Sequence, residues 1–278
     1  MIKITLITVT YNAEKLLQPT LDSVFRQNYA ALEHIVIDGA STDDTAVVAK
    51  DYMERSFASD NGHEVRLLVE PDNGIYDAMN KGLQMATGDY VCFLNAGDSL
   101  PADDTIAELV ANTGVDSYVA ADGGEDALPA VLYGNTDIVD GNRQFLAHRR
   151  LSPPEKLTWR SFRQGMLVCH QAFYARTDIA KHTPFNLMYR YSADFDWCIR
   201  IMKQAEDKNL PLANSGIVLA DYLKEGTTTR HHKASLGERF KIMATYYGLL
   251  TTYLLHAWFV VRAVVKRWRF LYPLGINN

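Results

Sequence analysis

Residues 1–100 alternate short apolar runs with segments in which apolar residues recur at helical spacing. The apolar runs are rich in β-branched residues and predict strands at residues 2–9, 34–38, 65–69 and 90–94. The segments between them predict helices around residues 16–25, 46–53 and 75–86. Strands that alternate with helices favour right-handed crossovers and a largely parallel sheet, so the pattern predicts an α/β fold.

The pattern loosens after a further predicted helix at residues 105–110. Gly, Asp and Ala dominate residues 112–129, which predict an exposed loop with a short strand at 116–120. Runs typical of a sheet return at 131–134, 136–139 and 166–174, and a basic stretch at 143–163 predicts irregular structure over the far side of a crevice. A helix that opens within residues 189–200 places Asp194 in its first turn.

Polar side chains follow successive predicted strands at the point where each strand ends. Thr10, Asp38, Asp72 or Asn73, and Asp98 share one edge of a parallel sheet, where open α/β sheets bind ligands. The chain has no G-x-G-x-x-G or P-loop sequence, so backbone capture of a pyrophosphate is disfavoured and a bound diphosphate would need a cation. Asp98 is either a helix cap or a ligand of that cation, and Asp38 is either a turn acid or an acceptor for a base N–H.

Two further features lie outside the strand ends. His170 and Gln171 interrupt an apolar run, so they are either a satisfied core pair or part of a site. Asp194 is either an ordinary first-turn acid, favoured by the helix macrodipole, or a base fixed at the mouth of the crevice.

The net charge and the number of cysteines exclude several classes of function. The net charge of −5 argues against a general nucleic-acid binder, while basic residues gather after residue 230. Three scattered cysteines support neither a disulfide framework nor a zinc site. Residues 1–8 read as a strand rather than a secretory signal, so we expect a cytoplasmic protein.

The C-terminal segment predicts a helical tail that meets a membrane. Residues 242–261 contain no Asp, Glu, Lys or Arg and are just long enough to span a bilayer, but basic residues flank both ends. An amphipathic helix lying on the cytoplasmic face fits better than a span, and the alternative is a helix packed on the catalytic domain. We therefore expect residues 1–229 to form the main domain and 230–278 the tail, with residues 225–232 as a flexible loop at the site.

Six motifs in order carry a resemblance to the family 2 glycosyltransferases of the GT-A fold, most of all to their bacterial exopolysaccharide and colanic acid branch. They are TVTYN at 8–12, VIDGASTDDT at 36–45, EPDNGIYDAMNKG at 70–82, TGDYVCFLNAGD at 87–98, HQ at 170–171 and SAD at 192–194. The resemblance covers most of the chain up to residue 229.

The resemblance implies inverting transfer of a sugar from a nucleotide diphosphate donor, usually a UDP-sugar, with Mg²⁺ or Mn²⁺. By this analogy Asp194 is the catalytic base and Asp98 the metal ligand, and the donor is bound by Thr10, Tyr11, Asn12, Asp38, Asp72, Asn80, Lys81 and Asn95. The acceptor would contact His170, Gln171 and Asp196. The family's acid-rich motif is reduced here to Asn95-Ala-Gly-Asp98, so we expect the metal to bind mainly together with the donor.

The expected function is therefore the glycosylation of a lipid-linked saccharide in exopolysaccharide, capsule or O-antigen synthesis. The thinned acidic motif supports an alternative from another class, a nucleotide-sugar-binding scaffold without turnover.

Overall fold

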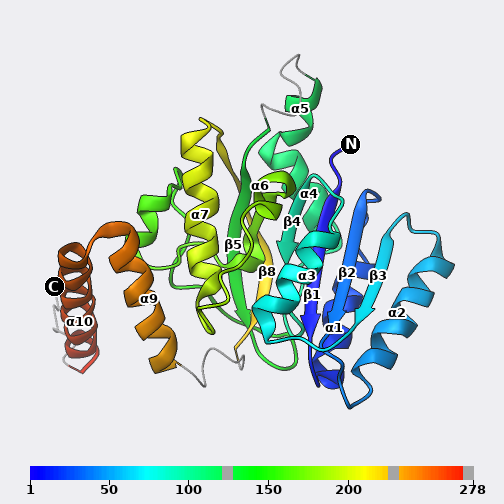
Figure 1. Cartoon of the computed structure of the whole chain (residues 1–278), viewed down its shortest axis with the longest axis horizontal. Coiled ribbons are helices and arrows are strands. Elements are labelled where there is room, and N and C mark those ends of the chain that lie inside the picture. Colours follow the sequence, from blue (N-terminus) through cyan, green and yellow to red (C-terminus); the bar gives the residue numbers. More distant parts are fainter. Residues whose placement is uncertain (121–127, 225–231, 272–278) are drawn as a thin grey trace, which may run out of the picture.

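The computed structural model describes residues 1–120, 128–224 and 232–271, and side chains within 1–117, 128–224 and 233–262 (Figure 1). The strands are β1 (Ile4–Thr10), β2 (Leu32–Asp38), β3 (Glu64–Val69), β4 (Tyr90–Phe93), β5 (Val131–Val139), β6 (Phe145–His148), β7 (Phe173–Arg176) and β8 (Leu212–Leu223). The α-helices are α1 (Glu14–Phe25), α2 (Thr45–Ser59), α3 (Ile75–Met85), α4 (Thr105–Thr113), α5 (Val115–Ala120), α6 (Thr177–Lys181), α7 (Ala193–Asp207), α9 (His232–Tyr247) and α10 (Leu249–Leu271). Two short 3₁₀ helices, η2 (Trp159–Gln164) and η3 (His170–Ala172), complete the described elements.

The strands form one sheet in the order β3-β2-β1-β4-β7-β5-β6, with β8 on the other edge of β5. β1 pairs in parallel with β2 and β4, and β2 pairs in parallel with β3. β7 then runs antiparallel between β4 and β5, whereas β8 is parallel to β5. The predicted α/β fold with a mostly parallel sheet flanked by helices is thus confirmed.

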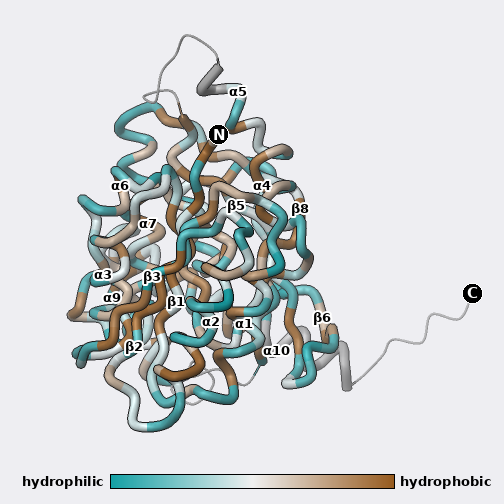
Figure 2. Tube along the Cα trace, turned by 90° about the vertical axis from the view of Figure 1, so that its right-hand side faces the viewer, coloured by the Kyte–Doolittle hydropathy of each residue, from teal (hydrophilic) through white to brown (hydrophobic). Residues whose placement is uncertain are grey.

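Burial on both faces explains why the first strands are mostly apolar rather than alternating between apolar and polar residues. Every residue of β1 and β2 is buried, and Figure 2 shows apolar segments along β1, β2 and β3. Val36 faces Leu17 and Leu21 of α1 together with Tyr52 of α2. Ile37 faces α3 on the opposite side, where a Cβ on Gly82 would lie only 3.2 Å from it.

Three segments differ from their predictions. The predicted strand at 116–120 is helix α5, which continues α4 after a left-handed turn at Gly114. The predicted strand at 166–174 begins only at Phe173, because His170–Ala172 form η3. The stretch 143–163 is partly regular, since it contains β6 and most of η2.

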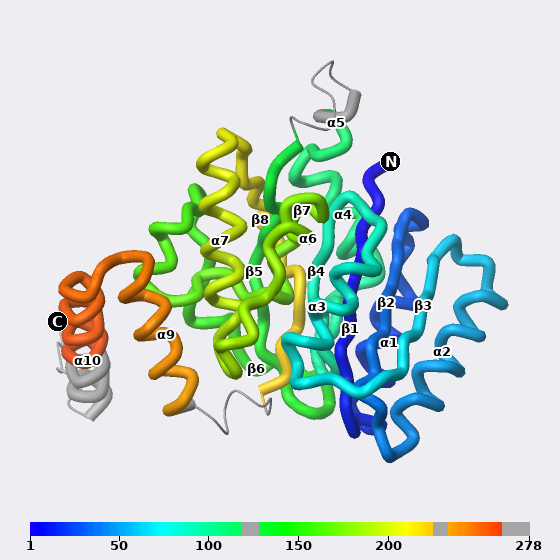
Figure 3. The backbone as a smooth tube through the Cα atoms, viewed as in Figure 1, coloured from blue at the N-terminus to red at the C-terminus, as the bar shows by residue number. Residues whose placement is uncertain are grey.

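The tail is two helices rather than one continuous segment. Gly248, with φ +84°, separates α9 from α10, and a side chain would be strained in that backbone conformation. α9 packs into the core through Ile242 and Met243. It lies beside α7 (Figure 3), and it also contacts η2. α10 exposes large apolar side chains that include Leu250, Leu254 and Trp258. Among the described residues, no helix combines the length and apolarity that crossing a membrane requires. The domain boundary after residue 229 stays a prediction.

Candidate active site

The carboxyl ends of β1 and β2 and the segment after β3 bring four predicted donor-binding residues together. Thr10 and Asp38 are paired across β1 and β2, and the Gly39 N–H donates to the Thr10 carbonyl at 3.0 Å. A Cβ on Gly39 would lie 2.5 Å from a carboxylate oxygen of Asp72 and 3.3 Å from the Tyr11 ring. Tyr11 is 61% exposed beside this edge, and the buried Thr10 hydroxyl has no partner among the described residues. The edge therefore offers an exposed aromatic ring, a carboxylate and a hydroxyl at one place.

The Asp38 carboxylate accepts hydrogen bonds from the turn that follows it. It accepts the Ser41 N–H at 3.1 Å and the Ser41 hydroxyl, so it holds the loop after β2 in shape. Asn12, at φ +47°, lies across from this loop and accepts the Thr42 N–H at 2.9 Å. The two loops are thereby joined, and a direct donor contact by Asp38 or Asn12 stays a prediction.

Asn80 and Lys81 of α3 are engaged with protein groups. The Asn80 amide makes two hydrogen bonds to the Phe185 backbone, at 2.7 and 3.1 Å. Lys81 pairs with Glu70 at 2.8 Å and donates to the Pro71 carbonyl at 2.6 Å. Asn80 thus fixes a loop under α3, whereas Lys81 lies next to the segment that carries Asp72.

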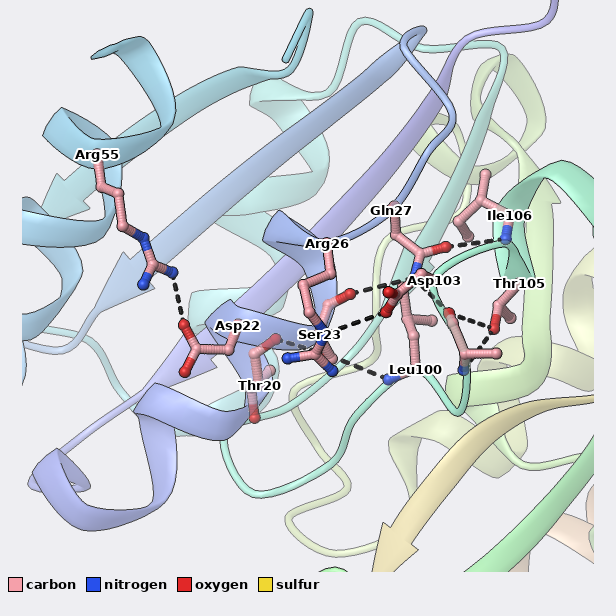
Figure 4. A network of polar contacts seen from close by, with 11 residues as sticks. Thr20, Asp22, Ser23, Arg26, Gln27, Arg55, Leu100, Asp103, Thr105 and Ile106 are labelled. Atoms are coloured by element: carbon pink, nitrogen blue, oxygen red, sulfur yellow. Dashed lines mark hydrogen bonds and ion pairs between the residues drawn. The ribbon is translucent and has the colours of Figure 1, made fainter. Parts of the chain in front are cut away.

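The loop after β4, which carries Asp98, is clamped onto α1. The Thr20 hydroxyl donates to the Asp98 carbonyl at 2.6 Å and accepts the Gly97 N–H at 3.0 Å. One turn further along α1, Ser23 accepts the Leu100 N–H at 3.1 Å (Figure 4). Gln27 then bridges the start of α4, donating to Ala102 and accepting from Ile106. These bonds fix the Asp98 backbone by contacts remote in sequence.

We predict that replacing Thr20 with valine lowers the free energy of unfolding by about 1–3 kcal/mol. The substitution preserves shape but leaves the buried Gly97 N–H and Asp98 carbonyl without a partner. Urea denaturation measures the change, and Thr20→Ser, which keeps the hydroxyl, is the matched control. Equal stability of the valine and wild-type proteins would show that the clamp contributes nothing.

Asp98 is 5% exposed and both of its carboxylate oxygens have protein partners. Gln171 donates to one oxygen at 2.8 Å, and the Leu223 N–H at the end of β8 donates to the other at 3.1 Å. Burial raises the pKa of Asp98 above its usual value, although the bond from Gln171 and the charge of Arg143 oppose the shift. A positive charge beside Asp98 would favour its ionised form.

The residue before Gln171 connects this acid to the second one. His170 Nδ1 lies 3.2 Å from an oxygen of Asp194, and its Nε2 lies 3.1 Å from the Asn95 amide nitrogen. If Asn95 donates to Nε2, then Nδ1 carries the proton and donates to Asp194. η3 therefore joins Asp98 and Asp194 through adjacent side chains that point in different directions.

Asp194 lies in the first turn of α7, as the sequence predicts, and it lines a pocket of about 220 Å³. Tyr76 donates to its other oxygen at 3.1 Å. Burial alone would raise the pKa of Asp194, but the hydrogen bond from His170 and the charge of Arg239 hold it below its usual value. The carboxylate is therefore oriented by two donors and is ionised at neutral pH.

Asp196, two residues further on, is held by the protein. Arg200 binds one of its oxygens at 2.7 Å and Tyr246 of α9 donates to the other at 2.8 Å. It thus fastens α9 to α7, and its contact with an acceptor stays a prediction.

The residues around Asp98 fit a hard divalent cation. A carboxylate has lone pairs for about four bonds, and Asp98 accepts two. The buried oxygens Asn95 Oδ1 and Gln171 Oε1 have no partner among the described residues, and oxygen ligands suit Mg²⁺ and Mn²⁺. The described residues contain no group of three or more His, Cys, Asp or Glu that could hold a metal. If a cation binds here, most of its coordination shell would come from the donor and water.

Sequence reasoning missed Tyr76 and Arg239 as members of this site. Tyr76 lies within a quoted motif, but its bond partner is 118 residues away. Arg239 reaches the pocket from α9, in the segment that we assigned to the tail. The one sequence signal for Arg239 was its positive charge within the tail, a segment that we otherwise predicted to meet lipid. The predicted loop at 225–232 lies outside the residues whose side chains the structure describes.

Comparisons with known proteins identify the class. Residues 5–182 match the family described as Glycosyl transferase family 2, and the chain belongs to this family. The PGL/p-HBAD biosynthesis glycosyltransferase of Mycobacterium bovis (strain BCG / Pasteur 1173P2) is 35% identical over 197 residues, covering 70% of this chain and 68% of the relative.

Solved structures share the fold at low sequence identity. TarS 1–349 of S. aureus, in complex with UDP-GlcNAc, gives a TM-score of 0.62 at 18% identity and covers 87% of this chain. This chain covers 65% of that TarS chain, which is less than two thirds of it. The mannosyltransferase PcManGT of Pyrobaculum calidifontis, in complex with GDP-Man and Mn²⁺, gives 0.56 at 18% identity and covers 99% of this chain and 81% of its own.

Proposed function

We propose that this chain is an inverting glycosyltransferase that moves a sugar from a nucleotide diphosphate, with UDP as the preferred nucleotide, to a hydroxyl of a lipid-linked saccharide. The observation that carries the proposal is Asp194, an ionised carboxylate oriented by Tyr76 and His170 in the wall of a pocket. Solved relatives of the same fold are described as complexes with UDP-GlcNAc and with GDP-Man and Mn²⁺, which supports a nucleotide-sugar donor.

In the proposed reaction, Asp194 takes the proton of the acceptor hydroxyl as its oxygen forms a bond to the anomeric carbon. The bond from that carbon to the diphosphate oxygen breaks on the opposite face, and the nucleoside diphosphate leaves with the electron pair. Attack is direct, so one carboxylate suffices and the configuration inverts. Mg²⁺ or Mn²⁺, held by Asp98 together with the donor, would offset the negative charge of the diphosphate.

The donor and acceptor would occupy different halves of the sheet. Tyr11 and Asp72 lie at the ends of β1 and β3, where the nucleotide would bind. The pocket of Asp194 lies on the other side of β4, among residues of β5, η3, α7, β8 and α9. The sugar to be transferred would therefore lie over the end of β4, beside Asn95 and Asp98.

The proposed setting is the cytoplasmic face of a membrane, in exopolysaccharide, capsule or O-antigen synthesis. The exposed apolar side chains of α10 and the adjacent exposed Arg262 support peripheral contact with lipid. A lipid-linked acceptor would then reach the pocket beside α9, which joins directly to α10.

A nucleotide-sugar-binding scaffold without turnover is the second candidate, because both oxygens of Asp98 already accept bonds from protein groups. Release of nucleoside diphosphate from a panel of UDP- and GDP-sugars, with Mn²⁺ or with a chelator, separates the two. We expect slow release that requires the metal even without an acceptor. Donor binding detected by thermal shift, with no release from any sugar tested, would support the scaffold instead.

A further inference from the structure

Among the residues that the structure describes, those lining the pocket of Asp194 carry more positive than negative charge. Its charged lining residues are Arg149, Arg239 and Asp194, accompanied by His170. Two guanidinium groups thus face a single carboxylate. At about 220 Å³ the pocket is smaller than the roughly 300–1,000 Å³ typical of sites for drug-sized ligands. It suits a single sugar unit or a small charged group.

The charge of Arg149 is solvated by the backbone but not cancelled. Its guanidinium donates to the carbonyls of Met166, Leu151 and Leu167 at 2.6, 2.8 and 3.3 Å. Carbonyl dipoles satisfy these N–H groups without contributing a negative charge. Arg149 therefore shapes the segment 151–167 and still leaves a positive potential in the pocket.

Arg239 is the side chain free to bind. Within the described parts of the chain its guanidinium has no hydrogen bond, and no carboxylate lies within ion-pairing distance of it. Its buried Nε is unpartnered, and the group rests 5.8 Å from the ring centroid of Phe195. A guanidinium whose buried N–H is unpaired costs free energy unless a ligand accepts from it.

The place of Arg239 in the fold indicates which substrate it would meet. It enters the pocket from α9, on the β5 and β8 side of Asp194, whereas the proposed nucleotide edge lies across β4 at β1 and β3. α9 is held there by Tyr246, which binds Asp196 of α7, and by Tyr247, which binds the Trp159 carbonyl at 2.7 Å. The guanidinium is thus fixed on the acceptor side of the proposed base.

We propose that Arg239 binds an anionic group, a phosphate or a carboxylate, that the acceptor carries within about one sugar unit of its reacting hydroxyl. This inference rests on the proposed function, because it assigns the pocket to the acceptor. Arg239 would bind the anion with planar, charge-assisted hydrogen bonds while the reacting hydroxyl of the acceptor contacts Asp194. Neutral acceptors would leave the Arg239 Nε unpaired and would bind more weakly.

The test measures anion binding directly, in protein saturated with UDP and Mg²⁺ so that the donor site is filled. Calorimetric titrations use inorganic phosphate, glucose 1-phosphate, glucuronic acid and, as the neutral probe, glucose. We expect phosphate to bind wild-type protein at least about tenfold more tightly than Arg239→Gln, with Arg239→Lys between them. Glucose 1-phosphate and glucuronic acid distinguish a phosphate from a carboxylate as the favoured anion.

Two further variants serve as controls for the phosphate titration. Asp194→Asn removes the one carboxylate among the described lining residues, so it should tighten phosphate binding severalfold although it blocks transfer. Arg262→Gln, which removes an exposed arginine of α10, should change nothing. Equal phosphate affinity in wild type and Arg239→Gln overturns the inference, as does loss of UDP affinity in Arg239→Gln, which would assign Arg239 to the donor. Failure of the proposed function would give a different result: the wild-type protein would transfer no sugar, although it would still bind phosphate through Arg239.

Discussion

Replacing Asp194 with asparagine is expected to lower the rate constant for sugar transfer by about 10²–10⁴-fold while leaving the donor dissociation constant within about twofold. Asparagine fills the same space and still accepts the bond from Tyr76, but it cannot take a proton. Transfer is measured as nucleoside diphosphate release that depends on acceptor, and donor affinity by calorimetry. Since the pKa of Asp194 lies below its usual value, this group should cause no loss of wild-type rate between about pH 8 and pH 5.

Asp196 provides a matched control on the same helix. Asp196→Asn also removes a buried charge, but one that Arg200 and Tyr246 bind. We expect it to lower the melting temperature and to leave the rate of folded enzyme within a few-fold of wild type. Full transfer activity in Asp194→Asn would refute the assignment of the base, and loss of donor binding would make Asp194 a structural residue.

Acidification from about pH 6.5 to pH 4.5 is expected to lower the free energy of unfolding by about 2–3 kcal/mol through His34 alone. His34 is fully buried, with Nε2 2.9 Å from the Thr8 hydroxyl and Nδ1 2.8 Å from the Tyr52 hydroxyl. Thr8 donates its own proton to the Leu94 carbonyl, so Nε2–H donates to Thr8 and Nδ1 accepts from Tyr52. A second ring proton would break the bond from Tyr52.

The sign follows from the two protonation equilibria. Burial, assisted by the charge of His63, lowers the pKa of His34 from 6.5 to about 3. Between these values the unfolded chain binds the proton and the folded chain does not, so stability falls as pH falls and levels off below about pH 3. Urea denaturation at constant ionic strength measures the slope. His34→Gln should be less stable at pH 7 but should lack this component, whereas His148→Gln, at an exposed side chain, should keep it.

The first half of the fold follows from the sequence because its strands are buried on both faces. β4 is apolar throughout, and β1 and β2 are mostly apolar without strict alternation, which is a distinctive pattern. β8 was not predicted, because Asn214-Ser-Gly216 interrupts it and its pairing with β5 shifts register there. Residues 116–120 include Tyr118 and Val119, residue types that favour strands, yet the segment is part of a helix that follows α4.

The positions of the two predicted acids in the fold could be read from the sequence, but the side chains that orient them could not. Asp98 and Asp194 stand at a strand end and in a first helical turn, both of which sequence patterns indicate. The link between them depends on η3, whose 3₁₀ turn sends His170 toward Asp194 and Gln171 toward Asp98. In a strand, too, neighbouring side chains point to opposite faces. The sequence therefore does not indicate whether His170 or Gln171 contacts a given acid.

The attachment of α9 bears on how this enzyme can be shortened for study. A chain cut after residue 229 would keep the eight strands that the structure describes. It would nevertheless uncover Trp159, remove the Tyr246 hydroxyl that donates to Asp196, and delete Arg239 from the pocket wall. A cut after Gly248 instead removes α10, which exposes large apolar side chains, and keeps all of these contacts. That second cut is the one to make when a well-behaved catalytic fragment is wanted.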